Sequence, residues 1–232
     1  MVAGGREGIV AFLLGSSSKR RQAAALIAAT PVVSKEVFYQ ATQPCDIILT
    51  TAPRRWRDPW LSRVWLHLSG LAQACPYCAA KIFLAPNLVV GYGFRRRWDR
   101  PLLKGVDYQR FVSLLDEALL LRVPALTRGQ QERIDRFVRG QFGAPFNLRW
   151  VIRSFLQRQL RKMPSRQNPS LAELSGGNGS MPLSCSTIIA WPFFQEGIAF
   201  AESPSLTWPI DFLLSPLTQK VCRLGGSDNE HR

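Results

Sequence analysis

Cys185 is the residue of this chain best placed to do covalent chemistry. It stands in Ser184-Cys185-Ser186, directly before the apolar run 187–190, where a helix is expected to begin. A helix N-terminus stabilises a thiolate, the reactive form of cysteine. A cysteine nucleophile also needs a base, and the chain has only two histidines, His67 and His231. Cysteine is also a common small core residue, so the alternative is that Cys185 has a purely structural role.

Length and composition favour one globular domain in a reducing compartment. The 232 residues are 46% hydrophobic and 20% charged, enough for one substantial core. The longest apolar runs, 8–15 and 23–29, are shorter than the ~20 residues of a membrane span. The basic cluster 19–21 follows the first run, the wrong order for a secretory signal, so we expect a cytoplasmic protein. Five cysteines, an odd number, argue for reduced thiols.

The net charge of +14 predicts attraction to anions such as phospholipid head groups, acidic cell-wall polymers or nucleic acid. Arginines alternate with tryptophans between Arg54 and Trp65, a composition that suits an anionic membrane surface. The alternative is that the tryptophans are core and the arginines solvated. No nucleic-acid motif accompanies the charge, so nucleic acid is not an expected partner. The sequence carries no signal for oligomeric state.

Local patterns predict alternating helices and strands followed by a polar loop. The expected elements of the first half are a helix at 19–29, a strand at 46–50, a helix at 60–72, a hairpin at 80–84 and 88–92, and a strand at 118–123. A helix is then expected from the capping box Thr127/Gln130 to Gly143, with Ile134, Phe137, Val138 and Phe142 buried. After it come a helix from Asn147, a flexible loop at 163–182 and the Cys185 helix, which Pro192 should kink or stop. Residues 1–43 are expected to form an extension with a short helix, 44–222 the domain, and 223–232 a disordered tail.

In their order, these segments resemble the circularly permuted branch of the NlpC-type papain-like superfamily, the YiiX/YebB-like and lecithin-retinol-acyltransferase-like proteins. The matching motifs cover about 44–221. The run Cys45-Asp46-Ile47-Ile48-Leu49 is similar to the family's Gly-Asp-Ile/Leu-Leu strand, and residues 76–84 are similar to its Pro-Tyr-Ser-His segment and the strand that follows. Residues 119–127 resemble a further strand, and residues 142–147 resemble its Leu-Gly-Lys-Pro-Tyr-Asp turn. Ser184-Cys185-Ser186 resembles the Tyr-Cys-Ser nucleophile motif, and residues 207–216 resemble the Thr-Pro-x-Asp-Leu segment.

The resemblance implies an α+β fold of permuted papain-like type, an antiparallel sheet with packed helices. It implies that Cys185 attacks an amide, ester or thioester of a peptide or acyl lipid through an acyl-enzyme, without metal or cofactor. It places Tyr77, Ser184 and Ser186 beside the substrate.

The family's catalytic histidine falls on Ala79, and the polar residue that orients it falls near Gly91. Without an imidazole, the thiol lacks its proton acceptor. The chain is then either a hydrolase with another base, for which His67 is the candidate, or a degenerate member that binds without cleaving. His67 stands between apolar neighbours on the expected helix 60–72, where a surface or core role is more common.

Two alternatives to the hydrolase remain. One is a non-catalytic peptide- or lipid-binding protein at a membrane surface. The other is a thiol-disulfide oxidoreductase, because Cys75-Pro76-Tyr77-Cys78 is also the glutaredoxin tetrapeptide. In glutaredoxins that motif follows a strand and opens a helix, whereas here a helical pattern precedes it and a β-prone run follows.

Overall fold

The computed structural model describes residues 17–51, 76–92, 103–144 and 184–225. Their centre is a seven-stranded sheet in the order β1-β7-β6-β2-β3-β4-β5. The strands are β1 Val32–Val33, β2 Ile47–Thr51, β3 Tyr77–Leu84, β4 Leu88–Tyr92, β5 Leu103–Asp107, β6 Ala118–Arg122 and β7 Gln219–Leu224. Neighbouring strands pair antiparallel, except that β1 pairs parallel with β7. The predicted α+β class with a mainly antiparallel sheet is confirmed.

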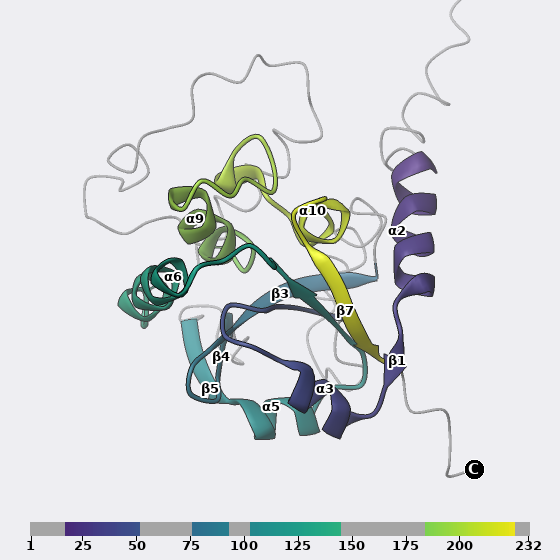
Figure 1. Cartoon of the computed structure of the whole chain (residues 1–232), viewed down its shortest axis with the longest axis horizontal. Coiled ribbons are helices and arrows are strands. Elements are labelled where there is room, and N and C mark those ends of the chain that lie inside the picture. Colours follow the sequence, from purple (N-terminus) through teal and green to yellow (C-terminus); the bar gives the residue numbers. More distant parts are fainter. Residues whose placement is uncertain (1–16, 52–75, 93–102, 145–183, 226–232) are drawn as a thin grey trace, which may run out of the picture.

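Helices cover both faces of the sheet (Figure 1). Side chains alternate between the faces, so Ile47 and Leu49 point one way and Ile48 the other. The α9 face is defined by Ile47, Leu49, Ala80, Ile82, Leu119 and Leu121, and the α3 face by Ile48, Phe83, Val89, Ala118 and Leu120. The helices on the α9 face are α2 Ser17–Ala29, α6 Arg128–Gly140, α9 Thr187–Gln195 and α10 Pro209–Leu214. The helices on the α3 face are α3 Lys35–Ala41 and α5 Tyr108–Ser113. A short 3-10 turn lies at Pro204–Leu206.

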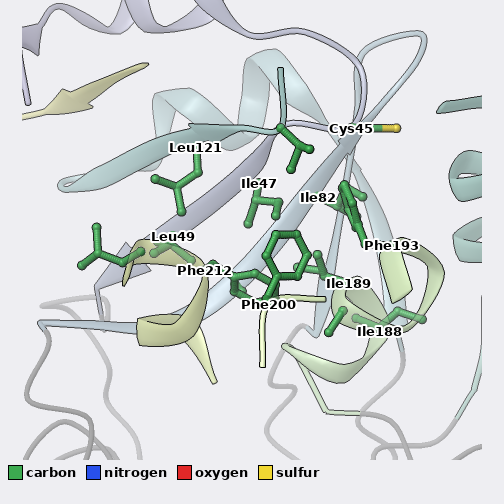
Figure 2. Close-up of a cluster of buried hydrophobic side chains, with 14 of the residues drawn as sticks. Cys45, Ile47, Leu49, Ile82, Leu121, Ile188, Ile189, Phe193, Phe200 and Phe212 are labelled. Carbon is green, nitrogen blue, oxygen red and sulfur yellow. The ribbon is translucent and has the colours of Figure 1, made fainter. Parts of the chain in front are cut away.

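Aromatic and branched side chains fill the layer between α9, α10 and the sheet. Figure 2 shows Ile188, Ile189 and Phe193 of α9 grouped with side chains of β2 and β3. Phe200 lies edge-on to Phe193 and to Phe212 of α10, with ring centroids 5.2 and 4.8 Å apart. This packing fixes α9, and therefore the residues that precede it, against the sheet.

A buried ion pair ties the start of β2 to the end of β6. Asp46 is 1% exposed and accepts hydrogen bonds from Arg122 Nε at 2.9 Å and from Arg122 Nη2 at 2.7 Å. The backbone N–H of Gln43 donates to the same carboxylate at 2.7 Å, and Arg122 Nη2 also donates to the carbonyl of Ala41 at 2.6 Å. These hydrogen bonds compensate part of the cost of burying the pair. The burial of Asp46 still outweighs them and raises the pKa of its carboxyl.

Most local predictions inside the described residues are confirmed. The 19–29 helix is α2, the 46–50 strand is β2, the hairpin is β3 and β4, and the 118–123 strand is β6. The capping box is present, because Thr127 Oγ1 accepts from Gln130 N while Gln130 Oε1 accepts from Thr127 N. The helices expected at 60–72 and from Asn147, and the loop at 163–182, lie outside the described residues.

Two helix ends differ from their predictions. The α6 helix stops at Gly140, and Gly143 lies in the turn beyond it with a φ of 84°. Phe142 is therefore past the helix and 43% exposed, so its predicted burial is wrong. In α9, Pro192 does not end the helix, which continues to Gln195 because Phe193, wholly buried, holds the last turn in the core.

The segment predicted as an N-terminal extension takes part in the domain. Ala23 of α2 is 1% exposed in the α9-face core, and α2 contacts α10. The N–H of Arg223 donates to the carbonyl of Pro31 at 2.8 Å where β1 pairs with β7. Because β7 extends to Leu224, the predicted tail 223–232 begins inside a strand. None of the described helices combines the length and hydropathy of a bilayer-spanning helix.

Candidate functional site

Ser184 starts the turn that carries Cys185. Its Oγ accepts a hydrogen bond from the N–H of Thr187 at 3.0 Å, and its carbonyl accepts one from the N–H of Ile188 at 3.1 Å. The same Oγ lies 2.7 Å from Thr187 Oγ1. The Ser184 hydroxyl is therefore engaged within the turn that leads into α9. Cys185 lies in this turn, two residues before the helix begins at Thr187.

The Cys185 thiol is half-buried and free, packs against the α9-face core, and has Ser186 Oγ at 3.9 Å. No hydrogen bond within the described residues uses the N–H groups of Cys185 or Ser186, which is the usual condition of the first amides of a helix. Ser186 itself is 3% exposed. The arrangement places a thiol beside two amide donors that can stabilise a developing oxyanion.

The other two cysteines with described side chains differ sharply from Cys185. Cys45 is 2% exposed, its Sγ lies 3.6 Å from the carbonyl oxygen of Gln131, and burial raises its pKa to about 12. Burial raises the pKa of Cys222, which is 3% exposed, to about 11. Both thiols are therefore protonated at neutral pH and shielded from reagents.

The strand register shows on which face of the sheet position 79 lies, the position onto which the resemblance places the catalytic histidine. Ala79 pairs with Thr50, which pairs on its other side with Ala118, so all three share the α3 face. Cys185 lies against the opposite, α9 face. A side chain at position 79 therefore points away from Cys185.

Position 79 faces this way because it alternates with Ala80, whose side chain is in the α9-face core. A bulge follows toward the start of β3. Between Thr50 and Thr51 the pairing shifts so that Thr51 meets Tyr77. Tyr77 therefore joins Ala80, Ile82 and Leu84 of β3 in the α9-face core, where it is 4% exposed. Its predicted contact with substrate stays a prediction.

Position 91 also lies on the α3 face. Gly91 is buried, and a Cβ built on it would come within 2.7 Å of Lys81 Cγ. The Lys81 ammonium lies 4.3 Å from the centroid of the Phe111 ring. The space beside Gly91 is therefore filled by the Lys81 side chain, which leaves no room for the predicted orienting residue.

The remaining candidate residues lie outside the described structure. These are His67, His231, Cys75 and the side chain of Cys78. Within the described ranges there is no histidine, and no cluster of His, Cys, Asp or Glu side chains could hold a metal ion.

No known protein family matches the chain, and no curated protein matches it. Among solved structures it is similar to the crystal structure of the metalloprotein YiiX from Escherichia coli O157:H7, DUF1105. The identity is 13%, the TM-score is 0.38, and the match covers 79% of this chain and 98% of YiiX. A TM-score of this size supports no conclusion about function, so the site is argued from the chain's own residues.

Proposed function

We propose that the chain is a permuted papain-like cysteine hydrolase, in which Cys185 forms an acyl-enzyme with an amide, ester or thioester. The observation that carries the proposal is the contrast between thiols. Cys185 is half-buried beside two helix N–H donors, whereas Cys45 and Cys222 are buried and their pKa values are raised. A nucleophile needs that exposure and that adjacent positive potential.

The chemistry requires three moves. Cys185 Sγ forms a bond to the carbonyl carbon, and the negative charge that develops on the carbonyl oxygen is stabilised by the N–H groups of Cys185 and Ser186. The bond to the amine, alcohol or thiol then breaks, and the leaving group takes a proton. Water hydrolyses the thioester and restores the thiol. A histidine base can come only from His67 or His231, because the chain has no other.

The start of β2 supports the papain-like reading. Cys45 stands where the family motif has glycine, and its φ is 67°, a left-handed conformation that glycine adopts without cost. The next residue, Asp46, matches the motif and anchors β2 to β6 through Arg122. The order of elements also follows the resemblance, because β1 to β6 precede the cysteine helix, although β7 follows it.

A second candidate is a protein that binds a peptide or acyl group at the same helix start without cleaving it. It is favoured by the lack of any histidine within the described ranges, which leaves Cys185 without an imidazole base among those residues. The oxidoreductase alternative has less support, because Tyr77 and Cys78 belong to β3 and not to the first turn of a helix. The Arg/Trp segment that suggested a membrane surface lies outside the described residues.

Intact-protein mass spectrometry after incubation with short-chain acyl thioesters and activated esters tests the nucleophile. We expect one acyl adduct on the wild type and none on Cys185→Ala, with Cys222→Ala as the matched control that still acylates. Continued release of acid indicates a hydrolase, and an adduct that persists indicates a protein without a base. An adduct on Cys185→Ala, or none on the wild type with any substrate, contradicts the proposal. A His67→Ala variant that acylates but no longer turns over would identify the base.

A further inference from the structure

A groove of about 340 Å³ lies between α6 and the C-terminal half of α9. It is formed by one stripe of each helix, with Arg133, Arg136, Phe137 and Gly140 facing Pro192 and Glu196. Residues at this spacing share one side of a helix. Pro192 follows Cys185 by about two helical turns, so the groove is separate from the start of α9.

An ion pair fixes one end of this groove. Arg133 donates from Nε and Nη2 to the two carboxylate oxygens of Glu196, each at 2.7 Å. Gln130 Nε2 donates to the backbone carbonyl of Glu196 at 3.3 Å. The hydrogen bond from Arg133 holds the pKa of Glu196 below its usual range. At neutral pH this pair is therefore ionised on both sides and adds no net charge to the groove.

Arg136 supplies the uncompensated charge. Two other arginines of α6 have acidic partners on the same helix, Arg128 with Glu132 and Arg139 with Asp135. Arg133 has Glu196, but Arg136 has no acidic partner among the described residues.

The C-terminal end of α6 opposes an anion, because its free carbonyls carry about half a negative charge. Arg136 carries a full positive charge and lies one turn before that end. The groove is therefore net positive.

The rest of the groove is open and combines the apolar residues Phe137, Pro192 and Gly140 with two glutamines, Gln141 and Gln195. Phe137 is half-buried against the α9-face core, and Pro192 lies opposite it. A Cβ built on Gly140 would meet no atom within 4 Å, so the missing side chain keeps this part of the groove empty. The absence of a side chain at position 140 leaves Phe137 and Pro192 accessible to an aromatic ring or short alkyl chain.

We propose that this groove binds a small organic anion, with its charged head at Arg136 and its apolar body between Phe137 and Pro192 over Gly140. A planar guanidinium suits carboxylate and phosphate heads alike, since both accept two parallel hydrogen bonds. The proposal is independent of the chemistry at Cys185.

Calorimetric titration of the full chain tests the site with four probes that share one ring. These are phenylacetate, phenyl phosphate, the neutral phenethyl alcohol and the cationic phenethylamine. We expect saturable binding of at least one anion with Kd on the order of 1 mM, the range for so small a ligand. Tighter binding of phenyl phosphate assigns a phosphate head, and tighter binding of phenylacetate assigns a carboxylate. Equal binding of the neutral or cationic probe, or no binding of either anion, overturns the proposal.

Two variants locate the site, each with a control on the same helix. Arg136→Gln removes the head-group partner and should weaken anion binding about tenfold or more, whereas Arg128→Gln, on an exposed side chain, should leave it unchanged. Gly140→Leu fills the open space and should abolish binding, whereas Gly129→Leu should not. Leucine favours a helix over glycine, so loss of binding by Gly140→Leu is not expected to reflect unfolding, and a thermal melt checks this. Equal effects of a variant and its control would refute the assignment.

Discussion

The two faces of the sheet differ in whether their polar groups have hydrogen-bond partners or are covered by other side chains. On the α3 side, the Asp46 carboxylate is saturated with donors, Cys222 is buried, and Lys81 fills the space over Gly91. On the α9 side, the chain presents a half-buried thiol next to unused helix amides and an arginine without an acidic partner among the described residues. The difference separates a scaffold face from the face on which chemistry and binding are expected.

Thiol reactivity should show the contrast most strongly. At pH 8 a thiol with a pKa of about 12 is thiolate for only about one part in 10⁴, and one with a pKa of about 11 for about one part in 10³. Iodoacetamide should therefore alkylate Cys185 orders of magnitude faster than Cys45 or Cys222 in the native protein, as measured by peptide mass spectrometry. The selectivity should vanish in denaturant. Cys45 belongs to the α9-face core, so the comparison between faces rests on Cys222. Comparable native rates of Cys185 and Cys222 would remove the distinction between the faces.

Removing the arginine of the buried pair should give the largest loss of stability. Arg122→Ala leaves the Asp46 carboxylate, 1% exposed, without two of its donors, which costs about 3 kcal/mol of unfolding free energy. Urea denaturation measures this loss. The matched Arg128→Ala, which breaks an exposed pair, should change stability by about 0.5 kcal/mol or less. A similar small loss for Arg122→Ala would mean that the α3 side is not anchored there.

At Cys45 the usual order of alanine and glycine should be reversed. With a φ of 67°, any residue with a Cβ pays about 1–2 kcal/mol that glycine does not. Both Cys45→Ala and Cys45→Gly lose the buried sulfur, and their difference sets the backbone cost of the Cβ against the methyl burial and lower unfolded-state entropy of alanine. We expect the glycine variant to be the more stable by about 1 kcal/mol in urea denaturation. If the alanine variant were the more stable, position 45 would not require the backbone freedom that glycine provides at the matching position of the family motif.

The smallest effect concerns the groove. Arg133 lowers the pKa of Glu196, so their pair stabilises the fold above the unfolded pKa of glutamate and loses this as pH falls through the lower folded value. Wild type and Arg133→Gln should therefore differ slightly in Tm at pH 7, and the difference should shrink below about pH 4. A difference that is constant with pH would mean that Arg133 acts through packing alone.

The sequence predicted the elements whose signals are local. The capping box of Thr127 and Gln130 predicts the start of α6, and two short apolar runs on either side of Pro86 predict the β3–β4 hairpin. Strands β1, β5 and β7 were missed, because two residues, a glycine-containing segment and a charged segment give no clear period of their own. Their pairing depends on partners far along the chain.

The site was predicted less well, for a geometric reason. Cys185 and its helix were found, since the capping serine and the apolar run adjoin it. Position 79 alternates with Ala80, and only the packing of α9 on the sheet shows that Ala80, and not position 79, faces Cys185. The Arg133–Glu196 pair joins residues distant in sequence and had no local signal either.

The pairing of β1 with β7 sets a condition on how the protein is made. Because β7 is the last strand of the sheet and lies between β1 and β6, the ribosome releases it only after the rest of the sheet has emerged. Until then, β6 is an edge strand whose apolar residues, Leu119 to Leu121, adjoin unpaired backbone groups. Such an edge recruits other strands, so a chain stopped before Gln219 is expected to aggregate. Completion of the sheet therefore depends on the final segment of the described chain.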